Sequence, residues 1–236
     1  MNRLIISSAF AVALTAAACT STNEEEEMPM SPPPVAQETP DMSFFLTSRP
    51  SPNGANLGGL AGADAMCQSL ATAAGAGDRE WRAYLSAEAT ATSSAVNARD
   101  RIGSGPWYNA DGVMVAANVG QLHNPAANNL NKQTSISETG AVINGRGDDP
   151  NQHDILTGSF EDGTLYIEKD VRSATCLNWT DGGQTSGVFA RVGHHDRQGG
   201  GPAPTSWNSS HNSQGCSLDV LRGTGGDGRF YCFAAD

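Results

Sequence analysis

Four side chains that could bind a metal ion lie close together toward the C-terminal end of the chain, namely His194, His195, Asp196 and His211. Imidazole nitrogens and carboxylate oxygens are donors that zinc prefers, so this set is a candidate metal site. Adjacent side chains point apart on an extended chain, however, and the glycine-rich segment between Asp196 and His211 fixes no geometry. The alternative, which we favour, is that these histidines are solvated side chains of a loop.

Catalytic motifs are absent from the sequence, which contains no G-x-S-x-G elbow, no H-E-x-x-H helix and no G-x-x-x-x-G-K-[ST] loop. His153 and Asp154 could form an acid–base pair, but neighbours in sequence do not necessarily face one substrate. We therefore predict that the protein is not an enzyme. The alternative is a metal-dependent secreted hydrolase that uses His194, His195 and His211.

Two short segments are candidate ligand-binding sites. Arg146, Gly147 and Asp148 form the tripeptide that integrins recognise on an exposed turn, and the surrounding glycine, aspartate and proline residues favour a turn. Trp207 and Asn208 could stack on a glycan and hydrogen-bond to it, although such a tryptophan is more often buried in a core. Chance occurrence of the tripeptide and burial of Trp207 are the alternatives that we favour.

The N-terminal segment has the features of an export signal. An apolar run follows Arg3 and ends in the small residues before Cys19, which is typical of a bacterial lipoprotein signal over residues 1–18 and predicts lipidation of Cys19. Secretion with a free Cys19 is the alternative. Residues 19–42 are acidic and proline-rich, a composition that predicts an extended tether. We expect the protein at the cell surface, attached to the outer membrane through the lipid alone.

The net charge of −11 at pH 7 limits the classes of partner. Polyanion binding needs a basic surface, so nucleic acid and heparin are poor candidates. We instead expect the partner of a monomeric protein to be an extracellular protein or a glycan.

Residues 43–236 are expected to form one α+β domain. Apolar residues at helical spacing predict a helix over residues 60–74, ended by Gly75 and Gly77. Alternation of apolar and polar residues predicts a strand at 81–86, and residues 43–48 are expected to form another. Further short strands between glycine-rich turns are predicted in five segments: 112–118, 153–167, 176–183, 187–193 and 228–234.

The cysteine count suits an oxidising compartment. Cys19 apart, four cysteines remain, enough for two disulfides with three alternative pairings. A structural zinc on these four cysteines is the alternative, and it is disfavoured because no pair has the close spacing of such sites.

The segments GGLAGADAMCQSLATAAGAG and WRAYLS, followed by LTGSFEDGT, TCLNWTDGG and GRFYCFA, resemble the endostatin-like domains of bacterial surface lipoproteins. This resemblance implies a C-type-lectin-like fold with an N-terminal helix, a short twisted antiparallel sheet and long loops. It also implies nested disulfides, Cys67 with Cys232 and Cys176 with Cys216. The helix and strand would then be scaffold, and the loops would carry the function.

The resemblance also raises the question of whether the domain binds calcium. Calcium-dependent lectins carry Trp-Asn-Asp before the third cysteine, whereas Ser209 stands in place of that aspartate here. We therefore predict no bound cofactor, with zinc or calcium as alternatives. The leading hypothesis is a surface lipoprotein whose endostatin-like domain acts as an adhesion module, and the remaining alternative is a structural cell-envelope lipoprotein.

Overall fold

Helix α1 (Gly59–Ala73) is the longest helix among the described residues and is where the sequence predicts a helix. The computed structural model describes residues 41–200 and 203–236. Within α1, Ala63, Cys67 and Leu70 lie on one buried stripe, because residues three and four apart share a helix face. Gly75 follows with φ +84, a left-handed conformation that ends the helix.

The predicted signal peptide, the lipidated Cys19 and nearly all of the tether lie outside the described residues. Within the described part of the chain, no helix combines the length and apolar character needed to cross a bilayer.

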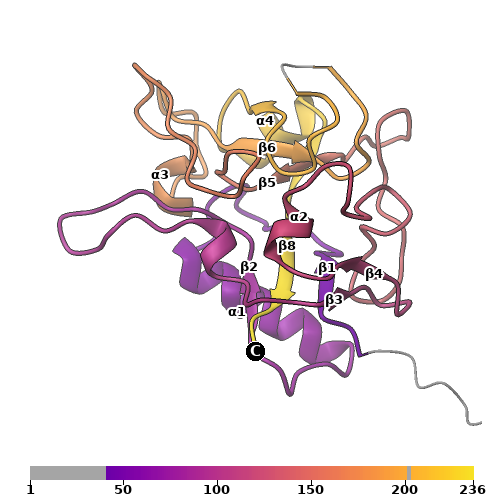
Figure 1. Ribbon diagram of the computed structural model, residues 1–236. Coiled ribbons are helices and arrows are strands. Elements are labelled where there is room, and N and C mark those ends of the chain that lie inside the picture. Colours follow the sequence, from indigo (N-terminus) through magenta and orange to yellow (C-terminus); the bar gives the residue numbers. More distant parts are fainter. Residues whose placement is uncertain (1–40, 201–202) are drawn as a thin grey trace, which may run out of the picture. The chain divides into compact units, whose positions relative to one another are not determined.

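A six-stranded sheet forms the centre of the domain (Figure 1). Its strand order is β1, β8, β5, β6, β7, and β2 also pairs with β8. The strands are β1 (Phe44–Leu46), β2 (Trp81–Ala83), β5 (Asp154–Leu156), β6 (Arg191–His194), β7 (His211–Asn212) and β8 (Gly226–Ala234). Four pairings are antiparallel, but β5 runs parallel to β8. The sheet is therefore mixed, which corrects the expected antiparallel sheet.

The remaining elements are short and flank this sheet. Strands β3 and β4 form a separate two-stranded sheet. These elements are η1 (Ala98–Asp100), β3 (Trp107–Tyr108), β4 (Met114–Ala116), α2 (Val119–Leu122), α3 (Cys176–Trp179) and α4 (Leu218–Gly223).

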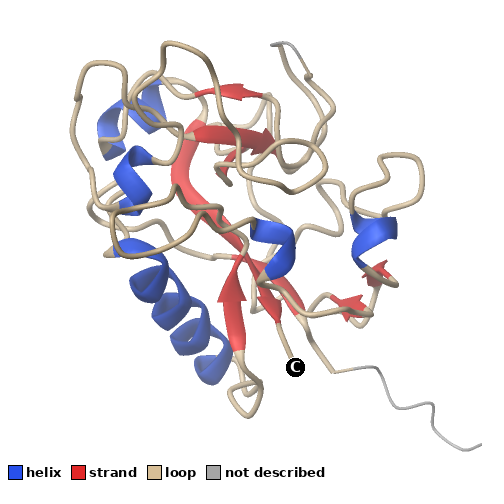
Figure 2. Ribbon diagram, turned by 60° about the vertical axis from the view of Figure 1, so that its left-hand side comes forward, coloured by secondary structure: helices blue, strands red, loops and turns tan. Residues whose placement is uncertain are grey.

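The sheet is buried on both faces along β8, because every residue of this strand is buried. Phe230 and Cys232 pack with Phe45 and α1 in one core, whereas Tyr231 and Phe233 pack with Phe44 in another. Alternate residues of a strand point to opposite faces, so one strand supplies both cores. Figure 2 shows α1 lying beside the crossing strands.

The two disulfides join Cys67 to Cys232 and Cys176 to Cys216, as the resemblance implies. Together with few helices and small sheets they give a mixed domain of the expected α+β class. They are also what an exported protein in an oxidising compartment would contain.

Segment 176–183 is not the strand that the sequence predicts. It begins with α3, a single turn in which Leu177 and Asn178 have left-handed backbone angles, with φ of 54° and 57°. Contacts from distant parts of the chain hold this turn, since the Trp179 indole donates to Ser86 O at 2.8 Å and Cys176 is bonded to Cys216.

Candidate metal centre

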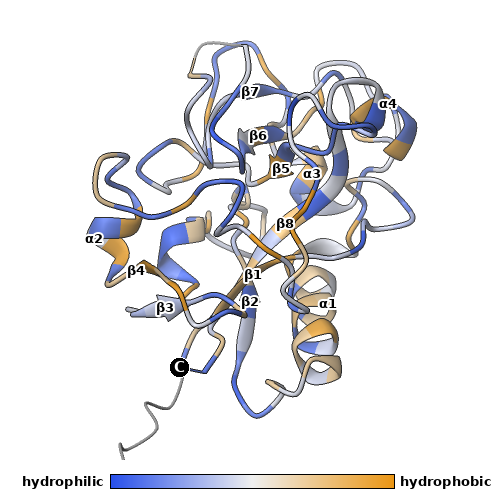
Figure 3. Ribbon diagram, turned by 90° about the vertical axis from the view of Figure 1, so that its right-hand side faces the viewer, coloured by the Kyte–Doolittle hydropathy of each residue, from blue (hydrophilic) through white to orange (hydrophobic). Residues whose placement is uncertain are grey.

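The register of three neighbouring strands brings an aspartate and two histidines to one face of the sheet. Asp154 on β5 is directly opposite His194 on β6, and His211 on β7 is opposite Val192 on β6. Val192 and His194 are two residues apart, so they share a face. Figure 3 shows hydrophilic residues along β7 and part of β6. His153 precedes β5 and completes the group.

Three imidazoles converge on one carboxylate oxygen. The Nε2 atoms of His153 and His194 each lie 3.2 Å from Asp154 Oδ1, and that of His211 lies 3.3 Å from it. Ligand atoms of His153, Asp154 and His194 lie within 4.8 Å of one another. In a tetrahedral zinc site with bonds of about 2.0–2.1 Å, neighbouring ligand atoms are about 3.3–3.4 Å apart. Each histidine is therefore at zinc-site spacing from the carboxylate.

The Asp154 carboxylate is buried without compensation from hydrogen bonds. The residue is 3 % exposed, and neither carboxylate oxygen has a hydrogen-bond partner among the described residues. The buried Nε2 of His194 is also without one. Buried polar atoms in proteins are nearly always satisfied, and an unpaired buried carboxylate is costly. A cation held between these atoms would satisfy them.

Each imidazole uses its other nitrogen to contact a neighbouring oxygen. Nδ1 of His194 lies 2.9 Å from Pro204 O, and Nδ1 of His211 lies 3.1 Å from Asn212 O. A carbonyl oxygen only accepts, so these contacts place the proton on Nδ1 and leave Nε2 with a free lone pair. Nδ1 of His153 lies 3.4 Å from Asp196 Oδ1, without a hydrogen bond among the described residues. Such outer contacts orient histidine ligands in metal sites.

Two glycines let the backbone approach the imidazoles closely. A Cβ on Gly199 would lie 2.7 Å from His194 Cε1 and 3.0 Å from His153 Cε1. A Cβ on Gly225 would lie 3.2 Å from His153 Nε2. Both glycines also have positive φ, which other residues rarely adopt. The histidine rings therefore lie in a cradle that only glycine fits.

The structure changes which residues make up the candidate metal site. His194 and His211 belong to the cluster, but His195 points away from it, and its Nε2 lies 3.0 Å from Asn144 O. Successive residues at the end of a strand face opposite sides, which separates the two neighbouring histidines. Asp196 does not face the other donors either; it contacts His153 on the outer nitrogen. His153 and Asp154 replace His195 and Asp196 among the candidate ligands. The expectation that these histidines are solvated is also wrong, because His194 and His195 are 0 % exposed.

The pKa values of the two carboxyl groups beside the histidines are lowered. Burial raises the pKa of Asp154, but contacts with His194 and His211 outweigh it and hold that pKa below its ordinary value. The pKa of Asp196 is likewise lowered, because its contact with His153 and two backbone N–H groups outweigh burial. Burial lowers the pKa of His195 to about 4. Contact with Asp154 raises the pKa of His211.

Trp207 and Asn208 are not available to a glycan in this structure. They are 3 % and 1 % exposed. Trp207 packs against Tyr84 and Tyr231, and the Asn208 amide donates to Tyr84 Oη at 3.0 Å. Both residues therefore belong to the core. This confirms the burial that we favour for Trp207 and corrects the interpretation of the two as ligand-binding residues.

The tripeptide at 146–148 lies beside the metal cluster. The Asp148 carboxylate contacts Lys132 Nζ at 2.5 Å and accepts from Gly145 N at 2.8 Å, so it is already occupied. Gly147 is exposed with φ +90. Arg146 is exposed, and it lines a cavity of about 440 Å³ together with the three histidines of the cluster.

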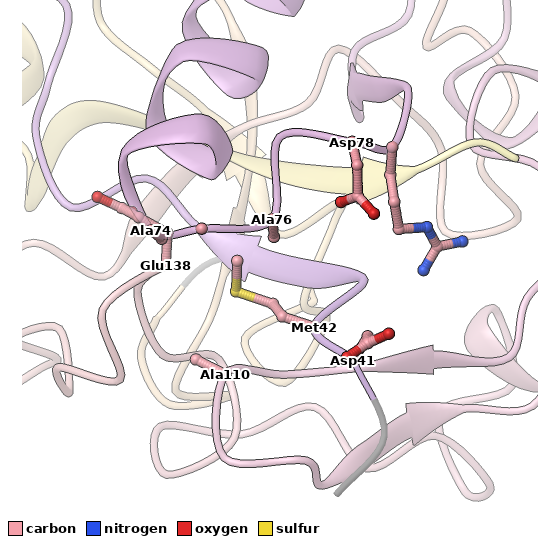
Figure 4. Close-up of a pocket in the computed structure, with 9 residues that line it drawn as sticks. Asp41, Met42, Ala74, Ala76, Asp78, Ala110 and Glu138 are labelled. Carbon is pink, nitrogen blue, oxygen red and sulfur yellow. The ribbon is translucent and has the colours of Figure 1, made fainter.

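A separate pocket of about 270 Å³ lies at the C-terminal end of α1 (Figure 4). Its lining includes Asp41, Asp78 and Glu138 but no histidine or cysteine. Arg79, which also lines it, pairs with Asp236 at 3.0 Å. This pocket lacks the converging donors of the cluster on β5, β6 and β7.

Comparison with known proteins gives no match, either to a protein-family model or to a curated protein.

Proposed function

We propose that this protein is an exported metal-binding protein whose domain holds a divalent transition-metal ion, zinc in the first instance. The proposed ligands are His153, Asp154, His194 and His211. The observation that carries the proposal is the buried carboxylate of Asp154, which has no hydrogen-bond partner in the described chain and three imidazole nitrogens 3.2–3.3 Å from one oxygen.

The donor set favours zinc over calcium. Calcium takes six to eight oxygen ligands, whereas this cluster offers three imidazoles and one carboxylate. Zinc binds such mixed nitrogen and oxygen donors in tetrahedral geometry. Copper and nickel also bind imidazole, so the ion selected in the cell depends on supply as well as on this site.

Metal analysis and calorimetric titration of the exported domain test the proposal. We expect one zinc per chain, and we expect His194→Asn to weaken zinc binding by more than about 100-fold, the upper end of the loss caused by removing an outer-shell partner. His195→Asn is the matched control, because the neighbouring His195 faces away from the cluster and its replacement should leave the affinity unchanged. A purified domain that binds no zinc, or equal losses in both variants, would contradict the proposal.

We also propose the specific fold and the lipid anchor that the sequence predicts. We infer an endostatin-like variant of the C-type-lectin-like fold, supported by the nested disulfides and by α1 preceding β2. We also infer attachment to the outer membrane through lipidated Cys19. Metabolic labelling with a radioactive fatty acid tests the anchor: label should enter the natural protein and not Cys19→Ser.

Adhesion to an extracellular protein or glycan is a second candidate function, which one surface feature favours. Ile167 is 72 % exposed and lines a groove of about 280 Å³ with Leu165 and Val171. Leu165 is 7 % exposed and Val171 is half-buried, so Ile167 is the exposed side chain of an apolar groove, which is a candidate binding surface. Binding to an array of matrix proteins and glycans should be lost in Ile167→Glu and kept in Val142→Glu, a control residue that is 48 % exposed elsewhere. Binding that survives Ile167→Glu would argue against this groove.

A further inference from the structure

The proposed metal centre borders a polar cavity. The cavity of about 440 Å³ is lined by His153, His194 and His211 but not by Asp154. The His211 side chain is 23 % exposed, whereas those of His194 and Asp154 are 0 % and 3 % exposed. An ion held by these residues would therefore have Asp154 behind it and the cavity in front of it. A ligand from solution would reach the ion from the cavity side.

Arg146 is the only arginine or lysine among the described residues that line the cavity. Its backbone N–H donates to Asp196 Oδ2 at 2.6 Å, and the same carboxylate contacts His153 Nδ1. Asp196 thus fixes the backbone of Arg146 to the metal centre. Among the described residues, the Arg146 guanidinium has no hydrogen bond or ion pair, unlike the neighbouring Lys132, which pairs with Asp148.

The charges around the cavity leave an excess of positive charge when a divalent ion is bound. Asp154 and Asp196 balance the two charges of the ion, and Arg146 then remains uncompensated. The rest of the chain is strongly acidic, so this local positive charge would attract a small anion to one place. Guanidinium groups pair with carboxylate and phosphate oxygens in a fixed geometry.

We infer that the cavity binds a small oxyanion, a phosphate or carboxylate group, that coordinates the metal ion through one oxygen and pairs with Arg146 through another. This inference rests on the proposed metal-binding function and adds a ligand class to it. Asn151 and Thr224, which also line the cavity, provide a polar rim for the rest of such a ligand.

Titration of the cobalt-substituted domain with inorganic phosphate tests the inference, because the visible absorption of Co²⁺ changes when its ligands change. We expect phosphate to alter the spectrum of the cobalt-loaded protein and to give no calorimetric heat with the metal-free protein. Parallel titrations with acetate distinguish a carboxylate from a phosphate preference, and chloride at the same ionic strength corrects for screening.

Two substitutions separate the role of Arg146 from general charge. Arg146→Ala should weaken phosphate binding by about 10-fold or more, as expected for the loss of a charge-assisted hydrogen bond. It should leave metal affinity within about twofold, because the backbone N–H that binds Asp196 is kept. Arg49→Ala is the control, since Arg49 is exposed and absent from the cavity lining.

The outcomes distinguish failure of the anion-binding inference from failure of the proposed metal-binding function. A cobalt-loaded protein that binds neither phosphate nor acetate overturns the inference and leaves the metal-binding function standing. Equal anion affinity in the natural protein and in Arg146→Ala also overturns it. A protein that binds no metal ion removes the proposed function, and the inference is then wrong as well.

Discussion

The imidazole of His194 illustrates how single residues build the proposed metal centre. Its Nδ1 contacts both Pro204 O and Ser210 Oγ, at 2.9 and 3.2 Å, while its Nε2 faces Asp154. Rotation of the ring would break all three contacts, so the ring is held in one orientation before an ion arrives. Affinity in such a site depends on this preorganisation, which makes it sensitive to small changes beside the rings.

Replacing Gly199 with alanine should therefore weaken metal binding. The added Cβ would lie 2.7 Å from His194 Cε1, and φ of +137° is itself unfavourable for alanine. We expect a loss of at least about 10-fold in zinc affinity, similar to the loss of an outer-shell partner. Gly200→Ala is the matched control, because a Cβ there meets no atom of the described residues within 4 Å. Equal zinc affinity of the two variants in calorimetric titration would contradict the cradle described for the histidines.

Titration of His123 should make the protein less stable at mildly acidic pH. Burial lowers its pKa below the ordinary value of 6.5, and this effect outweighs the contact of Nδ1 with Val119 O, which raises the pKa. Its Nε2 contacts Tyr84 Oη at 2.7 Å. The unfolded chain then binds a proton that the folded protein does not. The stability that the neutral ring provides is present above about pH 6.5 and falls as pH drops toward the folded pKa, by at most about 1.4 kcal/mol per pH unit.

The measurement compares natural protein with His123→Gln by urea unfolding in EDTA, between about pH 8 and pH 5. Glutamine can accept a hydrogen bond from Tyr84 but does not titrate. The natural protein should be the more stable of the two, and this difference should shrink as pH falls because His123 titrates and glutamine does not. Titrating groups common to both proteins cancel in the difference. A difference that stays constant over this range would show that His123 does not titrate as its burial implies.

Strand register is the feature of the elements that the sequence does not reveal. The helix near 60–74 and the strand segment at 81–86 follow from local periodicity, and the segments at 43–48 and 228–234 are predicted as short strands. The structure contains an element in each. The pairing of Asp154 with His194 joins residues far apart in sequence. Periodicity says nothing about such pairing. The available signal was the position of His153 and Asp154 at the start of a predicted strand segment.

The left-handed turn α3 is a second feature that local sequence patterns do not reveal, and its backbone conformation can be tested. Asn178 has φ of 57°, and its side chain accepts from Glu88 N at 2.6 Å and donates to Glu88 O at 3.1 Å. Asn178→Ala and Asn178→Gly both lose these bonds, but alanine also carries the steric cost of the left-handed region, about 1–2 kcal/mol. We expect the glycine variant to be the more stable of the two by about 1 kcal/mol.

Urea unfolding of the two variants measures this order, with a helix position as reference. Ala65 is an exposed residue of α1, where glycine should be less stable than alanine by about 1 kcal/mol. Glycine in place of alanine should thus lower the free energy of unfolding at position 65 in α1 and raise it at position 178 in α3. The same sign at both positions would mean that Asn178 is not held in a left-handed conformation.

At the scale of the whole molecule, the two disulfides should have separable effects on stability and on metal binding. Cys67–Cys232 closes the longer loop, with a sequence separation of 165 against 40 for Cys176–Cys216. On the chain-entropy model their removal costs about 5 and 4 kcal/mol respectively. Cys232 lies near the end of β8 farthest from Gly226, the residue that pairs with Asp154. Cys216 instead follows β7, an edge strand that pairs only with β6 in the described sheet.

Replacing the cysteines pairwise with serine tests this separation in the folded state, confirmed by near-ultraviolet circular dichroism. The Cys67→Ser, Cys232→Ser protein should unfold at lower urea than natural protein but keep its zinc affinity. The Cys176→Ser, Cys216→Ser protein should also lose about 10-fold in zinc affinity, because the segment carrying His211 is no longer tied to α3 and ordering it opposes binding. Equal zinc affinities in the two folded variants would mean that pairing of β7 with β6 alone positions His211, and that the shorter disulfide serves stability only.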